Sequence, residues 1–137
     1  MKTIAATERF LLAVDPAKNR LYCTMRGVWK QVDDVETYLN YWRTAIHQLS
    51  NHFTALVDLS GLRIMSQEWV DVAIEVENIV VEAGILATAE VIPANPTVKM
   101  QANQISQETK MMKKVCIDRE QAEVWLDSLE KKERKKS

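Results

Sequence analysis

The chain has 137 residues, of which 47% are hydrophobic and 27% are charged, and its formal net charge at pH 7 is -1. A chain of this length and apolar content can build one core without metals or disulfides. The near balance of charge excludes a global field that would attract nucleic acid or an anionic membrane. No segment approaches the roughly 20 apolar residues of a membrane span, and the N-terminal residues lack the apolar core of a signal peptide. We therefore expect a soluble, cytoplasmic protein with no nucleic-acid partner and no integral membrane segment.

The first third of the chain predicts a hairpin followed by a helix. Residues 9–14 and 20–26 are strand-like runs separated by turn formers, which indicates an antiparallel hairpin. A glycine is expected to end the second run. An aspartate at position 33 or 34 can cap a helix whose apolar residues recur at spacings of three and four as far as Leu49.

The stretch from Phe53 to Gly84 is the best-defined part of the sequence. Residues 53–59 form a short apolar run bounded by turn residues, which predicts a central strand buried on both faces. The polar residues in the segment 58–61 are expected to end this strand. Helical spacing from Trp69 to Ala83 predicts a long helix, and Gly84 is expected at its C-terminal cap.

The rest of the chain continues the alternation of strands and helices. In chain order it predicts a strand at 85–92, a helix at 96–110, a strand at 114–117 and a last helix from residue 118. The whole order, β-β-α-β-α-β-α-β-α, predicts an α/β domain at residues 1–130 and a basic, fraying tail at 131–137. Its sheet is expected to be mixed and mostly parallel, with about five strands and four helices.

Three features together resemble one known family. They are this order of elements, the run ALVDLSGLRIMSQEW and the ending KKVCIDREQAEVWL. The chain resembles the STAS domain (sulphate transporter and anti-sigma factor antagonist), and more closely the small stand-alone SpoIIAA-like proteins of bacteria. The resemblance implies a mixed sheet with packed helices, often compared with lipid carriers of the Sec14 type. It also implies a non-enzymatic regulatory module that binds a protein partner.

The family's regulatory motif is matched only in part. Its aspartate-leucine-serine step matches Asp58-Leu59-Ser60, but its Asp-Ser-Ser-Gly motif aligns with Ser66-Gln67-Glu68-Trp69. Glu68 therefore occupies the position of the phosphorylated serine, which argues against a phosphoserine switch. Ser66 is expected to be a helix N-cap, and Glu68 either favours the helix dipole or imitates the phosphorylated state. The predicted partner-binding or regulatory loop contains Asp58, Ser60, Ser66, Glu68 and Trp69.

A pocket for a small apolar, lipid-like ligand is the alternative functional prediction. The helix at 96–110 is weakly amphipathic, and methionines around it provide adaptable apolar surface. The residues predicted to line a pocket between this helix and the sheet are Met65, Val98, Met100 and Ile105.

Other reactive side chains form no recognisable catalytic or metal-binding motif. Asp58 and Glu90 lie near strand ends and suggest paired acid and base groups, but no third group completes such a site. His47 and His52 are five residues apart, which is not the spacing of a helical metal pair. We therefore expect no enzymatic activity, no metal and no cofactor.

Two further pairs of residues bear on redox state and assembly. Cys23 and Cys116 lie in separate strand-like runs and predict buried free thiols, with a disulfide between them left open. Trp29 and Tyr41 are expected near the edges of the domain, where exposed aromatic surface would favour a homodimer.

Overall fold

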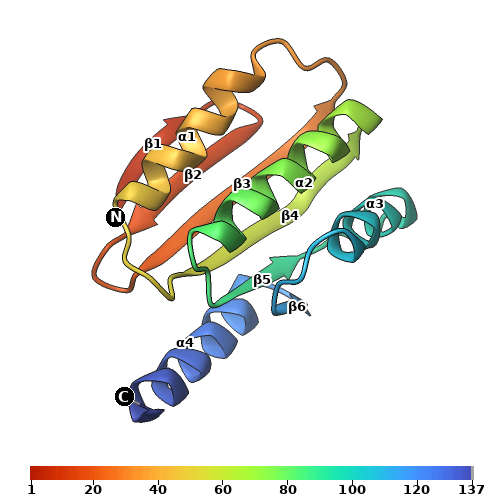
Figure 1. The fold of residues 1–137 in the computed structure, drawn as a ribbon. Helices are drawn as coiled ribbons and strands as arrows, with labels where there is room; N and C mark the ends of the chain where they lie inside the picture. The colour runs from red at the N-terminus through yellow and green to blue at the C-terminus, as the bar shows by residue number, and fades with distance from the viewer. Residues whose placement is uncertain (137) are drawn as a thin grey trace.

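The structure, a computed structural model, describes residues 1–136 as one α/β domain with six strands and four helices (Figure 1). In chain order the elements are β1 (Lys2–Ala6), β2 (Phe10–Asp15), β3 (Arg20–Trp29), α1 (Val35–His47), β4 (Thr54–Met65), α2 (Gln67–Glu82), β5 (Ala87–Val91), α3 (Pro96–Gln107), β6 (Lys113–Cys116) and α4 (Arg119–Lys136). Residues 131–136, which were predicted to form a separate tail, continue α4, and residue 137 of that tail lies outside the described residues. None of these helices combines the length and apolar character that a membrane span requires.

The six strands form one mixed sheet in the order β1-β2-β3-β4-β5-β6. The first three strands pair in antiparallel fashion, and β3 to β6 are parallel. Each parallel crossover moves the chain one strand further in the same direction. Because such crossovers are right-handed, α1, α2 and α3 lie on one face of the sheet, and α4 alone packs on the other (Figure 1).

The strand count differs from the predicted five because the N-terminal segment forms β1. Lys2 pairs with Val14 and Ala6 pairs with Leu11, so β1 extends the predicted hairpin by one strand. The hydroxyl of Thr7 accepts a hydrogen bond from the backbone N–H of Phe10 at 3.1 Å and closes the turn. β1 is a short, mostly exposed edge strand without an alternating pattern, so its sequence carries little strand signal.

The central strand β4 is longer than predicted, because it does not end at the polar segment 58–61. It shifts register against β3 at two places, which marks two β-bulges. The carboxylate of Asp58 accepts hydrogen bonds from the backbone N–H of Ser60 at 3.0 Å and from its hydroxyl at 2.6 Å. The polar residues that predicted a turn therefore shape a bulge inside a strand. β3 likewise passes Gly27, which has φ of 77°, and ends at Trp29.

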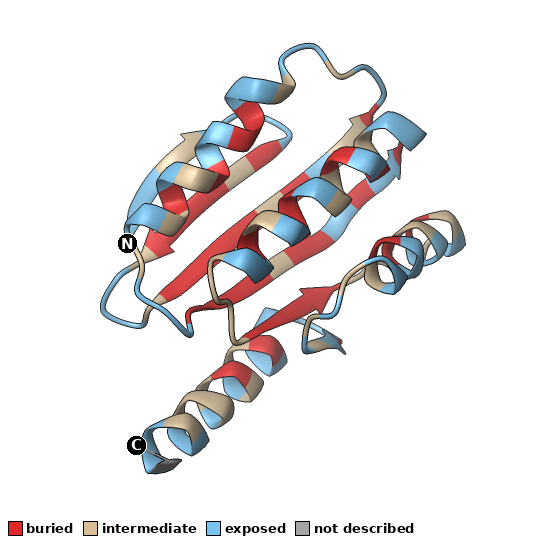
Figure 2. Cartoon of the chain, in the orientation of Figure 1, coloured by how far each residue is buried: buried red, intermediate tan, exposed pale blue. Residues whose placement is uncertain are grey.

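The sheet divides the hydrophobic core into two layers. The larger layer lies under α1, α2 and α3, and Figure 2 shows its buried positions along the strands and the inner sides of these helices. It contains a cluster of aromatic rings that includes Phe10, Trp29 and Tyr38. The smaller layer, under α4, is built from small strand residues such as Ala89 and from Leu126 of the helix.

A fully buried arginine attaches α4 to the sheet. Nε of Arg20, on β3, donates a hydrogen bond to the hydroxyl of Thr54 at 2.9 Å. Its guanidinium also lies 3.2 Å from Glu123, 3.1 Å from Asp127 and 2.8 Å from Glu130. These three carboxylates come from successive turns of α4, so the buried charge fixes where the helix lies along the sheet.

Candidate functional site

A cavity of about 80 Å³ lies between the sheet and the helices α1, α2 and α3. Its floor contains the small side chains of Cys23, Ala55 and Val57, from β3 and β4. The helix α2 faces this floor with Ala73 and Val76. Small side chains thus oppose one another across the interface and leave unfilled space, whereas protein interiors are normally close-packed.

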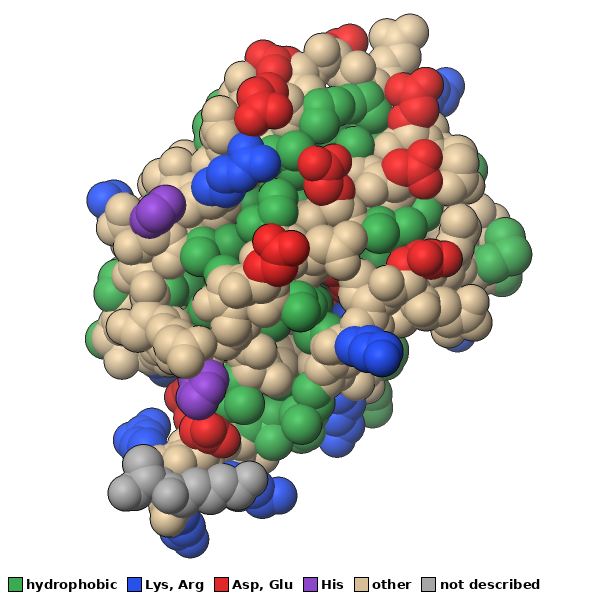
Figure 3. All heavy atoms as spheres, in the orientation of Figure 1, with side chains coloured by type: hydrophobic (Ala, Val, Ile, Leu, Met, Phe, Trp, Pro, Cys, Tyr) green, Lys and Arg blue, Asp and Glu red, His purple; other side chains and the backbone are tan. Residues whose placement is uncertain are grey.

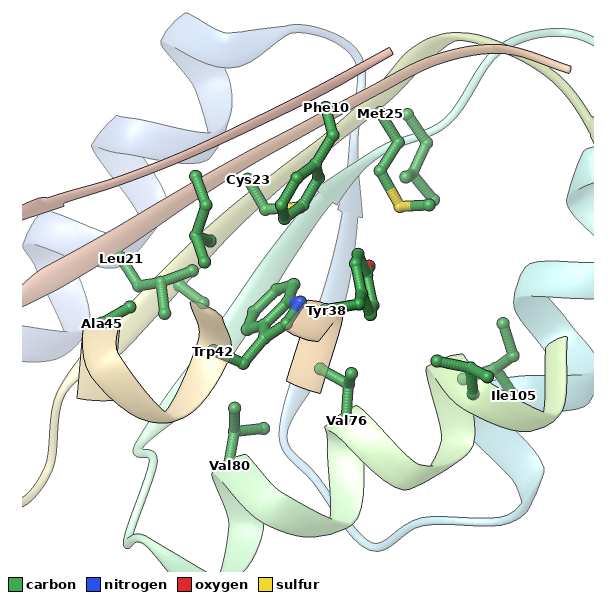
Figure 4. Packing of buried hydrophobic residues seen from close by; sticks show 14 of the residues in the cluster. Phe10, Leu21, Cys23, Met25, Tyr38, Trp42, Ala45, Val76, Val80 and Ile105 are labelled. Atoms are coloured by element: carbon green, nitrogen blue, oxygen red, sulfur yellow. The ribbon is translucent and has the colours of Figure 1, made fainter. Parts of the chain in front are cut away.

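Aromatic residues of α1 form one side of the cavity. Tyr38 and Trp42 both line it, and Figure 4 shows the indole nitrogen of Trp42 on the side of the ring toward Tyr38. Trp42 is 5% exposed, and its N–H lies near the hydroxyl of Tyr38 without making a hydrogen bond of regular geometry to it or to any other described residue. Burial raises the pKa of Tyr38, so its hydroxyl stays protonated at neutral pH. An unpaired buried N–H costs about 1–3 kcal/mol, which an acceptor on a bound ligand would recover.

Two buried carboxyl groups line another part of the cavity. They belong to Glu77 of α2 and Glu90 of β5, which are 9% and 7% exposed. The ammonium of Lys113, on β6, contacts the carboxylate of Glu77 directly and lies 3.5 Å from Oε2 of Glu90. The hydroxyl of Thr109 donates a 2.6 Å hydrogen bond to the other oxygen of Glu77. Glu77 therefore has a partner on each oxygen, whereas Glu90 has one long contact.

The electrostatic environment favours the neutral form of Glu90. Burial raises the pKa of Glu90, and the neighbouring Glu77 carboxylate raises it further, while Lys113 acts in the opposite direction. Glu90 also lines an open pocket of about 470 Å³ between α3 and β6, together with Lys99. This carboxyl group therefore lies between the internal cavity and the outer surface.

The structure brings together only two of the four residues predicted to line an apolar pocket. Met65 and Ile105 line the cavity, whereas Val98 is fully buried in the core beside it. Met100 is 67% exposed and cannot line an interior space, because α3 turns the opposite side of its helical repeat toward the core. The pocket predicted from the sequence also lacked Trp42, because its position in the helical pattern indicated only a role in core packing.

Glu77 and Glu90 were missed as a pair, although each carries a sequence signal. Glu77 interrupts the run of apolar residues on the inner face of α2, and Glu90 lies in an apolar strand. Polar residues at such positions are buried and need partners. Their shared partner, Lys113, is distant in the sequence, so the cluster as a whole is not visible there.

Three residues of the predicted regulatory loop lie at the start of α2. Ser66 is the N-cap, as predicted, and its hydroxyl accepts a 3.3 Å hydrogen bond from the backbone N–H of Trp69. The ring of Trp69 packs edge-on against Trp29, with centroids 4.7 Å apart, and its N–H donates to the carbonyl of Gln31. Glu68 is exposed in the first helical turn, so it is available to solvent or to a partner.

The other two loop residues lie in the β4 bulge. Ser60 is exposed, and Asp58 is buried on the α4 side of the sheet, where it lies 3.2 Å from the guanidinium of Arg119. Burial by itself raises the pKa of Asp58, but the hydrogen bonds from Ser60 and the contact with Arg119 outweigh it and hold that pKa below its ordinary value. Asp58 is therefore an ionised, structurally paired carboxylate.

Asp58 and Glu90 do not form a shared acid–base site. The register pairs Val57 with Glu90, so these two side chains share a face, and Asp58 points to the opposite face. The sheet therefore separates the two carboxyl groups, and the catalytic pairing suggested by the sequence is wrong.

The remaining candidate residues either lie away from the cavity or have a structural role. His47 is exposed, and Nδ1 of His52 lies 3.3 Å from Glu133. No group of three potential metal ligands occurs among His, Cys, Asp and Glu in residues 1–136. Both cysteines are free and buried, as predicted. Trp29 is buried rather than exposed at an edge, because it belongs to the aromatic cluster, while Tyr41 remains exposed.

Comparison with known proteins adds no family assignment. No protein-family model matches the chain, and no curated protein matches its sequence significantly.

Proposed function

We propose that this protein binds a small, mainly apolar molecule with a hydrogen-bond acceptor, as a carrier or a sensor. The cavity under α2 is the observation that carries this proposal. Unfilled space in a core forfeits dispersion contacts on every wall, so native cores contain few voids. A bound molecule would restore these contacts and give the unpaired N–H of Trp42 an acceptor.

The size of the cavity sets the size of the occupant. A volume of about 80 Å³ is smaller than the roughly 150 Å³ of a cavity that accepts benzene. A molecule with a few carbon atoms and one oxygen fits this space, whereas an entire lipid would require α2 to move. A short alcohol such as 1-butanol is therefore a suitable first probe.

Titration of the ¹⁵N-labelled protein with 1-butanol, followed by NMR, tests this function. We expect a saturable shift of the Trp42 indole N–H signal that exceeds the shifts of the other tryptophan indoles. The variant Ala55→Leu fills the cavity from its floor and should lose this response. Ala94→Leu adds the same side chain at an exposed position and should retain it. A Trp42 signal that does not respond, or one that responds equally in Ala55→Leu, would contradict the proposal.

The second candidate function is a regulatory module of the anti-sigma factor antagonist type. It is supported by the Asp58-Leu59-Ser60 step and by the exposure of Ile64 and Glu68 on either side of the α2 cap. An exposed isoleucine beside an exposed carboxylate is a plausible contact area for a protein partner. Such a partner would be independent of the cavity.

Co-purification with matched variants tests the second candidate. A specific partner should be lost from Ile64→Glu and from Glu68→Ala, and it should be kept by Glu75→Ala on the exposed side of the same helix. Recovery of the same proteins with all three variants would remove this segment from consideration as an interface.

A further inference from the structure

We infer that the occupant of the cavity also carries a positive charge, so that the site recognises a short aliphatic amine through the carboxylate of Glu90. The inference rests on the proposed function and adds the chemical class of the ligand. It is carried by the charge balance of the buried groups, by the partners of each group and by the position of Glu90.

The buried cluster contains two carboxyl groups and one ammonium group. Glu77 and Glu90 share Lys113 as their cationic partner. With both carboxylates ionised, the cluster would hold one uncompensated negative charge on residues that are less than one-tenth exposed. Such a charge is avoided either by binding a proton or by binding a second cation. An ammonium group on the ligand would balance the cluster with both carboxylates ionised.

The hydrogen-bonding capacity of Lys113 is already engaged elsewhere. Its ammonium group contacts Glu77 directly and donates a 3.1 Å hydrogen bond to the hydroxyl of Ser106. The remaining contact, to Oε2 of Glu90, is 3.5 Å long. Among the described residues, none donates a hydrogen bond to Oε1 of Glu90. Glu90 is 7% exposed, and this oxygen has acceptor capacity left for a ligand.

Trp42 provides a separate indication that a polar ligand belongs in the same cavity. Its unpaired N–H is also more than nine-tenths buried, and it comes from α1 rather than from the charged cluster. The two groups are complementary to different atoms. An ammonium donates to Glu90, and an oxygen of the ligand accepts from Trp42.

Acidic residues predominate on α2 and β5, which form part of the cavity wall, while Lys99 of α3 lines the outer pocket. Residues 64–98, which include α2 and β5, contain no Lys or Arg and six acidic residues, namely Glu68, Asp71, Glu75, Glu77, Glu82 and Glu90. Figure 3 shows acidic side chains spread over this face of the molecule. Because Glu90 lines both the cavity and the open pocket between α3 and β6, an amine that enters from that pocket reaches it first.

Binding of an amine is coupled to the protonation of Glu90. The charged groups that face Glu90 are Glu77 from α2, Lys113 from β6 and Lys99 from α3 across the outer pocket. The ligand enters as an ammonium ion, and a protonated Glu90 releases its proton to solvent when the ion pair forms. Affinity for an amine should therefore increase as the pH rises through the pKa of Glu90, while affinity for a neutral alcohol should stay constant.

Calorimetric and NMR titrations with three probes of similar size test the inference. The probes are n-butylamine, 3-amino-1-propanol and neutral 1-butanol, each with five non-hydrogen atoms. We expect 3-amino-1-propanol to bind about tenfold or more tightly than 1-butanol at pH 7, and to bind more weakly at pH 5. In Glu90→Gln, which keeps the shape of the side chain, amine affinity should fall by about tenfold while 1-butanol affinity stays within about twofold. Glu75→Gln, on the exposed side of α2, should behave as the wild type.

The outcomes separate this inference from the proposed function. Binding of 1-butanol together with equal or weaker binding of the amines would overturn the amine site and leave the apolar cavity site intact. Failure of all three probes would overturn both. The pH dependence is measured on the unaltered protein, so the inference stays testable even if Glu90→Gln does not fold.

Discussion

Asp58 and Glu90 lie one register step apart on neighbouring strands, and they face opposite sides of the sheet. Asp58 is held by Ser60 and Arg119 on the α4 side. Glu90 faces the cavity on the other side, and the ammonium of Lys113 lies 3.5 Å from its carboxylate. The two carboxyl groups therefore have pKa values displaced in opposite directions, lowered for Asp58 and raised for Glu90.

Replacement of Asp58 by asparagine is expected to destabilise the protein at neutral pH. Because the pKa of Asp58 is lower in the folded state, its stabilising effect is present above the unfolded-state pKa of about 3.9 and is lost as the pH falls through the folded value. Urea denaturation at pH 7 should show a loss of about 1–3 kcal/mol for Asp58→Asn, and this loss should shrink below about pH 4. Asp33→Asn, at an exposed position, serves as the control. A loss that is equal at pH 3 and pH 7 would contradict the explanation.

Replacement of Glu90 by glutamine is expected to stabilise the protein relative to the wild type as the pH rises, which is opposite to the effect expected at Asp58. The pKa of Glu90 is raised in the folded state, so its favourable contribution is present below the unfolded-state value of about 4.3 and is lost as the pH rises through the folded value. Glutamine stays neutral throughout. Thermal unfolding from pH 4 to pH 8 should therefore show that the melting temperature of Glu90→Gln increases relative to that of the wild type as the pH rises. A variant that becomes progressively less stable than the wild type over this range would refute the prediction.

Filling the cavity should stabilise the protein, whereas the same change on the other face of the sheet should not. Ala55→Val places two methyl groups in the unfilled space and is expected to raise the free energy of unfolding by about 0.5–2 kcal/mol. Ala89→Val adds the same groups at a fully buried position in the layer under α4 and is expected to cost about 1–3 kcal/mol. Equal effects in chemical denaturation would mean that the two layers do not differ in packing.

Loss of the negative charge at Glu130 should weaken the attachment of α4. Glu130 accepts a 2.8 Å charge-assisted hydrogen bond from the buried Arg20, so Glu130→Gln is expected to cost about 1–3 kcal/mol. Hydrogen exchange should show the loss of protection chiefly in α4. Glu120→Gln, at an exposed position of the same helix, should change stability by less than about 0.5 kcal/mol. Similar exchange patterns in the two variants would argue against the role of Arg20.

The N-cap at Ser66 predicts a difference between two substitutions. Ser66→Ala removes the acceptor for the Trp69 N–H and should cost about 1 kcal/mol, whereas Ser66→Asp supplies another acceptor and should cost little. Thermal unfolding distinguishes them. A loss with Ser66→Asp as large as with Ser66→Ala would show that the hydroxyl has a role beyond capping.

Local signals in the sequence predicted most elements of the fold. The cap residues Asp34 and Ser66 begin helices in the structure, and Gly84 follows the end of α2 with φ of 92°. Each of these signals depends on backbone groups within one helical turn, so neighbouring residues suffice to reveal them. The alternation of apolar runs likewise predicted an α/β domain with four helices.

Tertiary contacts decided the features on which function depends. The bulge at Asp58 forms because β4 pairs with β3, and the separation of Asp58 from Glu90 follows from their register. The cavity arises where small residues such as Cys23 and Ala55 meet beneath α2, although each alone is an ordinary core residue. The sequence by itself determined which segments form helices and strands, because those preferences are local. Only the folded structure decided which side chains meet, because strand register and helix packing join residues that are far apart in the chain.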